Sequence, residues 1–207
     1  MDWGICSLRK EDCTDAAELR FEADEWGLLP LLGKGFFAEI LRATCDSKWG
    51  FGMVCVNTER RIAALIVASL DIQKYYYDII MRRGPMLAFK GLIELMRNPK
   101  LVYTLYGYFN YSGNVPQHGI PAEWLTLVVR KQYRGRRLGQ MMTQALIQEY
   151  RKRGVKRFRS TVNSANIVSC HLHDISGFHL LETVSILGQS LNVYKYDIEY
   201  DPDSIGP

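Results

Sequence analysis

The sequence lacks the features of a membrane, secreted or zinc-binding protein. It has five cysteines, an odd number, and no C-x-x-C pair, so we expect neither a disulfide framework nor a zinc site. Its longest strongly apolar run, Ile62 to Leu70, has nine residues, about half of the roughly 20 that a membrane helix needs. The N-terminal stretch lacks the basic start and apolar core of a signal peptide. We therefore predict a cytoplasmic protein whose cysteines are reduced and mostly buried.

The chain also has little net charge, no internal repeat and no low-complexity segment. Its 207 residues are 47% hydrophobic and 23% charged, with a formal net charge of +4. This balance favours a folded core over disorder. The length suits one domain, which we assign to residues 1–207, with room for a sizeable insertion.

The basic residues are unevenly distributed. Eleven of the 26 Lys and Arg side chains fall between positions 130 and 159, where Glu149 is the only acid. They are Arg130, Lys131, Arg134, Arg136, Arg137, Arg151, Lys152, Arg153, Lys156, Arg157 and Arg159. A local positive field of this kind attracts a polyanion, either a nucleic acid or a multiply phosphorylated small molecule.

The first third of the sequence alternates between strand and helix patterns. Residues 4–9 favour a short strand, and residues 10–27 favour a helix with acids in its first turns and Gly27 at its end. A second, shorter helix is predicted over residues 33–50. Residues 51–72 then favour a hairpin of two apolar strands around the polar turn Asn57 to Arg60.

Residues 73–114 differ in character, because they are rich in Tyr, Met and Leu and are interrupted by Gly84-Pro85, Asn98-Pro99 and Gly113. We predict two or three short helices here. The clearest is "PMLAFKGLIELMR", with Pro85 in its first turn, where a missing backbone N–H is tolerated.

The last third has the most regular pattern. It predicts a strand over residues 123–129, a helix from Leu138 to Gly154, a strand over residues 155–163, a short helix over residues 166–176, and a closing hairpin over residues 179–200. This order favours a mixed α/β sheet with its ligand near the first strand–helix junction.

The loop "YRGRRLGQ" (residues 133–140) lies at that junction. A glycine-containing turn that leads from a strand into a helix exposes backbone N–H groups, and these groups bind phosphates together with the helix dipole. The loop has neither the G-K-[ST] of a Walker A motif nor the G-x-G-x-x-G of a dinucleotide-binding loop. By itself it is also compatible with a solvated basic turn.

The longer stretch "LVVRKQYRGRRLGQMM" resembles the acyl-CoA signature of the GNAT superfamily of N-acyltransferases. That signature is Leu-x-Val, four residues, Arg/Gln-x-x-Gly-x-Gly/Ala, and then a helix. Leu127, Val129, Arg134 and Gly139 are in register with it. Arg137 replaces the first motif glycine.

A second stretch, "NIVSCHLHDISGF", resembles another element of the same family, Asn-x-x-Ala, three residues, Tyr, three residues, Gly-Phe. Asn166 matches the Asn, Ser169 replaces the Ala, His173 stands where Tyr is common, and Gly177-Phe178 closes the element. The resemblance covers Glu123 to about Tyr196 well and leaves residues 72–114 unexplained.

The resemblance implies an α/β fold of GNAT type, with a mixed, mostly antiparallel central sheet flanked by helices. Residues 72–114 would then be a helical insertion between the third and fourth strands. It also implies an N-acetyltransferase that moves an acetyl or related acyl group from acetyl-CoA, or a related acyl-CoA, to the primary amine of a small molecule by direct attack. An amino sugar or a nucleotide-linked amino sugar is one candidate acceptor.

The resemblance further implies roles for individual residues. Acyl-CoA would be bound by the strand and loop residues Leu127, Val128, Val129, Arg134, Gly135, Arg136, Arg137, Leu138 and Gly139, and by Asn166. Glu123 would be the general base and His173 the acid that protonates the leaving thiolate.

Each of these residues also has a purely structural interpretation. Glu123 suits a solvated strand edge, His173 a packed histidine and Asn166 a helix cap. Tyr194 and Tyr196 are alternative acids. Leu125, Leu127 and Val129 are expected in the core under either interpretation.

Two rival functions remain open. The basic residues between 130 and 159 would suit a nucleic-acid-binding module, although we expect no nucleic-acid partner, because that function does not explain the spacing from Asn166 to Phe178. A GNAT-fold protein that binds acyl-CoA without turnover is the other. The insertion at residues 72–114 would be an acceptor lid, a homodimer interface, a membrane contact, or simply extra packed helices.

Overall fold

The computed structural model describes residues 3–23, 32–99, 117–186 and 188–198. Its centre is a seven-stranded sheet with the strand order β1-β2-β3-β4-β5-β7-β6. The strands are β1 (Gly4–Ser7), β2 (Gly50–Val56), β3 (Ile62–Ser69), β4 (Glu123–Val129), β5 (Arg157–Asn163), β6 (His179–Ile186) and β7 (Gln189–Asp197). All neighbouring strands are antiparallel except β4 and β5. The predicted mixed, mostly antiparallel sheet is confirmed.

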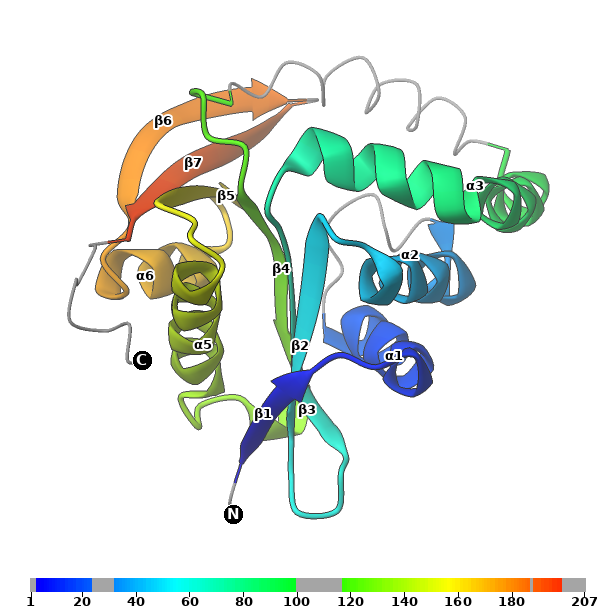
Figure 1. Cartoon of the computed structure of the whole chain (residues 1–207), viewed down its shortest axis with the longest axis horizontal. Helices are drawn as coiled ribbons and strands as arrows, with labels where there is room; N and C mark the ends of the chain where they lie inside the picture. The colour runs from blue at the N-terminus through cyan, green and yellow to red at the C-terminus, as the bar shows by residue number, and fades with distance from the viewer. Residues whose placement is uncertain (1–2, 24–31, 100–116, 187, 199–207) are drawn as a thin grey trace.

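Helices cover both faces of this sheet (Figure 1). They are α1 (Cys13–Ala23), α2 (Lys34–Asp46), α3 (Ile72–Arg97), α5 (Leu138–Lys152) and α6 (Ile167–Ile175), with 3-10 turns at Lys10–Asp12 and Lys131–Tyr133. Helices α5 and α6 lie on one face, and α1 and α2 lie on the other, with α3 packed beside α2.

The central strand β3 explains why both faces are covered. All of its eight residues are buried, since alternate side chains enter two different apolar clusters. Ala64 and Ile66 pack with the α5 side, whereas Leu65 and Val67 pack with α1 and α2. A strand that is apolar on both faces needs a helical layer on each.

The insertion between β3 and β4 is confirmed as helical over residues 72–97, but this described part is one continuous helix, whereas we predicted a separate helix that begins at Pro85. Helix α3 begins after Asp71, whose side chain accepts a hydrogen bond from Lys74 N at 3.1 Å, and it continues through Pro85. Proline removes one backbone N–H and frees the carbonyl four residues earlier. That carbonyl belongs to Met81, which is 64% exposed, so water can reach it. Residues 100–114 of the predicted insertion lie outside the described residues.

A β-bulge changes the orientation of side chains along β4. Thr126 pairs with Val67 and Trp124 pairs with Ala68, so Leu125 is the extra residue. Leu125, Leu127 and Val129, which we predicted in the core, are partly buried and do not pack on the same face of the sheet. Instead Leu125 packs toward α1, α2 and α3, whereas Leu127 and Val129 pack toward α5.

None of the helices in the described ranges, including the 26-residue α3, combines the length and apolar character of a membrane span.

Candidate active site

Strands β4 and β5 pair only at their beginnings. Glu123 is opposite Arg159 and Trp124 is opposite Ser160, and Arg159 N donates to Ala122 O at 3.0 Å. From Leu125 to Val129, β4 pairs with no strand on its β5 side among the residues that the structure describes. Backbone polar groups along this edge are available to a strand-like ligand.

A short connection leads from the end of β4 into helix α5. Tyr133 is buried and anchors the turn against Trp3, with 5.1 Å between ring centroids, and Arg134 Nε donates to Val129 O at 3.2 Å. Met141 N makes the first helical hydrogen bond, to Arg137 O at 3.0 Å. The N–H groups of the three residues between them therefore have no carbonyl partner within the helix. This end of α5 fits an anionic group.

Arg137, which replaces the motif glycine, has a left-handed backbone with φ 59° and ψ 14°. Glycine adopts this conformation without strain, whereas other L-residues pay roughly 1–2 kcal/mol. The loop therefore keeps the glycine-type geometry although the side chain is arginine.

Arg137→Gly is expected to raise the free energy of unfolding by roughly 0.5–1 kcal/mol, because relief of the left-handed strain exceeds the added entropy of the unfolded chain. Urea denaturation of the variant measures this. As a matched control, Gly135→Ala introduces a side chain at φ 76° and is expected to destabilise the protein. A less stable Arg137→Gly variant would show that the arginine side chain stabilises the folded protein by more than its backbone strain destabilises it.

Gly139 lies where α5 begins beside α6 and β4. A Cβ atom at this position would lie 3.4 Å from Leu172 of α6 and 3.9 Å from Leu127 of β4, which are ordinary van der Waals distances. Packing against these two elements therefore leaves room for a methyl group at this position.

The basic cluster predicted from the sequence is divided in the structure. Arg130 is bound to Asp15, Glu22 and the Ile62 carbonyl at 2.7–3.0 Å, Arg153 pairs with Glu149 and Arg159 is buried. The remaining exposed residues form two groups at opposite ends of the 15-residue helix α5, about 22 Å apart at 1.5 Å per residue. Only the group at its N-terminal end, Lys131, Arg134, Arg136 and Arg137, adjoins the candidate phosphate site.

Glu123 forms a buried ion pair with Arg159. Its Oε2 accepts a hydrogen bond from the Arg159 guanidinium at 2.6 Å, and the two side chains are only 13% and 5% exposed. Burial raises the pKa of the Glu123 carboxyl above its ordinary value, and Arg159 acts against that rise. The carboxylate is therefore not a solvated strand edge.

His173 is packed among aromatic rings. It stacks on Trp124 with 4.6 Å between centroids and also contacts Phe178 and Tyr194. Its Nδ1 lies 2.8 Å from Ser169 O, so the neutral ring carries its proton on Nδ1 and Nε2 is an acceptor. Nε2 is buried, with no hydrogen-bond partner in the described part of the chain. Burial lowers the pKa of His173, which favours this neutral form.

Asn166 caps helix α6, since its side-chain oxygen accepts a hydrogen bond from Ser169 N at 3.0 Å. The predicted capping role is confirmed, and the cofactor contact stays a prediction. Tyr194, one of the alternative acids, is buried, and Asn192 Nδ2 lies 3.5 Å from its hydroxyl.

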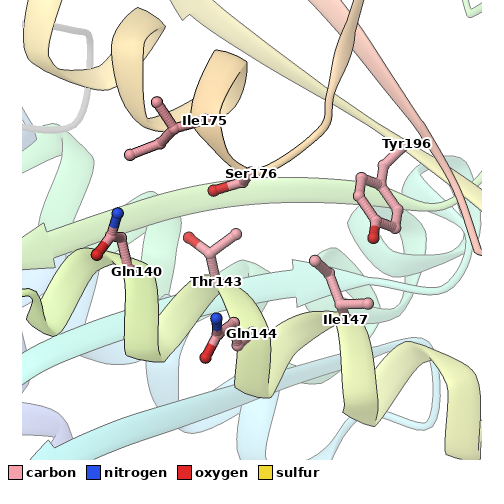
Figure 2. Close-up of a pocket in the computed structure, with 7 residues that line it drawn as sticks. All are labelled: Gln140, Thr143, Gln144, Ile147, Ile175, Ser176 and Tyr196. Atoms are coloured by element: carbon pink, nitrogen blue, oxygen red, sulfur yellow. The ribbon is translucent and has the colours of Figure 1, made fainter.

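A cleft separates α5 from α6 (Figure 2). Its volume is about 310 Å³, and Gln140, Thr143, Gln144 and Ile147 of α5, Ile175 and Ser176 at the end of α6, and Tyr196 of β7 line it. Gln140 lies in the first turn of α5, so the cleft adjoins the candidate phosphate site. Tyr196, the other alternative acid, therefore lies beside α5 in this cleft.

The sequence analysis did not predict three features of this region: the ion pair of Glu123 with Arg159, the bulge at Leu125, and the cleft. A signal existed for the first, because an arginine between Phe158 and Ser160 in a predicted core strand requires a partner. The polar residues at positions 140, 143 and 144, which share one helix face, were a weaker signal for the cleft.

Comparison with known families gives one match within the chain. Residues 89–178 match the model of the acetyltransferase (GNAT) family, a range that contains β4, the loop, α5, β5 and α6. No curated protein matches the sequence.

Solved structures resemble the whole chain. The ribosomal-protein-S18-alanine N-acetyltransferase from Escherichia coli is 13% identical, with a TM-score of 0.62 and 99% of each chain covered. A GNAT-family acetyltransferase from Streptococcus pneumoniae is 13% identical, with a TM-score of 0.61, over 96% of this chain and 100% of its own. The spermidine/spermine N-acetyltransferase from Vibrio cholerae is 11% identical, with a TM-score of 0.57 and 95% of each chain covered. At these identities the likeness concerns the fold.

Proposed function

Because the chain carries an acetyltransferase (GNAT) domain and is therefore an acyltransferase by family, we propose that it transfers an acetyl group from acetyl-CoA to the primary amine of a small molecule. The observation that carries the proposal is the early separation of β4 from β5, which leaves one edge of β4 open along the part of the strand that leads into the loop before α5.

The residues in this region fit acyl-CoA. The open backbone edge of Leu125 to Val129 offers hydrogen bonds to the amides of the pantetheine arm. The first N–H groups of α5 and the side chains of Arg134, Arg136 and Arg137 suit the phosphates. The cleft beside Gln140 has room for a further part of the molecule. Acyl-CoA supplies the activated thioester.

Glu123 is proposed as the general base. An amine acceptor has a pKa of about 10 and must lose a proton before its nitrogen can attack. A buried carboxylate with a raised pKa accepts such a proton more readily than an ordinary carboxylate. The backbone hydrogen bond from Ile72 N to Pro121 O, 2.9 Å long, joins the start of α3 to the residues just before β4. We therefore propose that the acceptor approaches between α3 and Glu123.

The source of the proton for the leaving thiolate has two candidates, His173 and Tyr194. A neutral His173 whose Nε2 is an acceptor is a poor donor, whereas the Tyr194 hydroxyl keeps its proton because burial raises its pKa.

His173→Phe tests this choice. The variant keeps the ring stack on Trp124 and removes a buried nitrogen, so we expect it to fold and to lose far less than the 10²-fold or so that removal of a positioned acid causes. Steady-state kcat at saturating substrates is the measurement. A loss of about 10²-fold or more in the folded variant would assign the acid role to His173.

The proposed reaction is tested by two measurements on the wild-type protein. Acetyl-CoA is expected to raise the Tm, and CoA thiol is expected to appear when acetyl-CoA is mixed with an accepted amine from a panel that includes amino sugars, nucleotide-linked amino sugars and polyamines. Thermal stabilisation without thiol release from any amine would favour a non-catalytic acyl-CoA-binding protein. No stabilisation by acetyl-CoA would remove the proposal.

The role of the insertion stays a prediction. Helix α3 exposes eight large apolar side chains, Tyr76, Tyr77, Ile80, Met81, Met86, Phe89, Leu92 and Met96, which is compatible with an acceptor lid or with a homodimer interface.

A further inference from the structure

Two cysteines lie in contact at the junction of α1 and α2, on the side of the sheet opposite α5 and α6. The Sγ atoms of Cys13, the first residue of α1, and Cys45, near the end of α2, are 3.8 Å apart. Cys13 is fully buried, whereas Cys45 is partly accessible. The pair has no part in the candidate active site.

Both sulfurs are held by the connection that follows β1. Cys13 Sγ lies 3.3 Å from Arg9 O, and Cys45 Sγ lies 3.4 Å from Leu8 O. Since Leu8 and Arg9 are consecutive, one short segment keeps the two side chains directed toward each other. The sulfurs must approach by a further 1.8 Å or so to reach the bond length of about 2.05 Å in a disulfide.

The two thiols are not equivalent. The hydrogen bond from Cys13, and to a smaller extent the Lys10 ammonium, lowers the pKa of Cys45 below its ordinary value. The pKa of Cys13 is raised, first by that same hydrogen bond and then by burial. Cys45 therefore forms the thiolate first, and it is also the more accessible of the two.

We propose that Cys13 and Cys45 form a dithiol modification site that a hydroperoxide such as hydrogen peroxide converts to an intramolecular disulfide. The Cys45 thiolate attacks one peroxide oxygen, the O–O bond breaks, and the leaving hydroxide takes up a proton to become water. Cys13 then transfers its proton and attacks the Cys45 sulfenic sulfur, which releases a second water. In balance, two thiols and one hydrogen peroxide give one disulfide and two waters.

The other three cysteines lack such an arrangement. Cys6 and Cys55 are on neighbouring strands, but their side chains enter different clusters on opposite faces of the sheet. Cys170 lies beside Asn192, whose amide nitrogen is 3.7 Å from its sulfur. Oxidation is therefore expected to give one specific bridge.

The test is oxidation of the dilute full-length protein with hydrogen peroxide, followed by alkylation and peptide mass mapping. We expect a linked peptide pair containing Cys13 and Cys45, a mass about two units below that of the dithiol, and full recovery of both thiols with dithiothreitol. Cys170→Ser is the matched control and should give the same bridge. In Cys13→Ser and separately in Cys45→Ser, the bridge should be absent.

In Cys13→Ser the Cys45 sulfenic acid, which then has no second thiol to react with, should be trapped by dimedone. The proposal is overturned if wild-type Cys45 ends as sulfinic acid without a bridge, if the bridge joins other cysteines or two chains, or if dimedone does not label Cys45 in the folded Cys13→Ser variant. Cys13 is buried and Cys45 is partly accessible. If Cys13→Ser fails to fold, Cys45→Ser therefore remains a usable test of the bridge.

Discussion

Glu123→Gln is expected to lower kcat/KM for the amine by about 10²-fold or more, because glutamine keeps the shape of the side chain but cannot accept the amine proton. The Gln oxygen can still accept the hydrogen bond from Arg159, which limits the loss of stability caused by removing the counter-charge of this buried guanidinium. Acetyl-CoA affinity should be unchanged, because Glu123 lies at the start of β4 and the phosphate site lies beyond its end. Steady-state kinetics and an acetyl-CoA thermal shift measure the two effects.

The pH profile separates a basic role from a structural one. Burial raises the pKa of Glu123, and only the deprotonated carboxylate accepts a proton. Wild-type kcat/KM should therefore decline as the pH falls through this raised pKa, and that limb should vanish in Glu123→Gln. Equal rates and an identical acid limb in both proteins would leave Glu123 only as the partner of Arg159.

Arg159→Leu is expected to reduce the free energy of unfolding by about 3–5 kcal/mol, the range found when one member of a buried ion pair is removed. Both side chains are almost inaccessible, so the remaining Glu123 carboxylate would be buried without its counter-charge. Glu123 and Arg159 are also the first of the two residue pairs at which β4 and β5 align. Chemical denaturation of the variant is the measurement.

The double variant Glu123→Leu/Arg159→Leu is the control, and it should recover most of the lost stability, because it leaves no buried charge. The effect of Arg159→Leu should also depend on pH. Burial raises the folded-state pKa of Glu123, so a protonated Glu123 stabilises the folded state. This stabilisation is fully present below the unfolded-state pKa and is lost as the pH rises through the folded-state pKa. The loss in Arg159→Leu should therefore shrink toward acid pH. If the loss of stability does not depend on pH and also occurs in the double variant, it arises from packing and not from the unpaired charge.

The sequence by itself determined the strands, most of the helices and the position of the loop. Local patterns suffice for these features: β4 coincides with the strand predicted over residues 123–129, α5 begins at the predicted Leu138, and Asn166 caps α6. The order of elements and the two motif resemblances also indicated the mostly antiparallel sheet and the acyltransferase family. Each of these inferences depends on residues that are close together in the chain.

Only the tertiary structure decided the environment of the candidate catalytic groups. Arg159 is 36 residues from Glu123 in sequence. Its position in a predicted core strand indicated that it needs a partner, but no local pattern could identify Glu123 as that partner. The bulge at Leu125 depends on the register with β3, and α3 continues through Pro85 because the affected side of the helix is exposed. His173 stands at a motif position for an acid, yet Trp124, Phe178 and Tyr194 come together from separate elements to bury it. Desolvation and charge pairing set the pKa of a group, and both depend on contacts that exist only once the chain has folded.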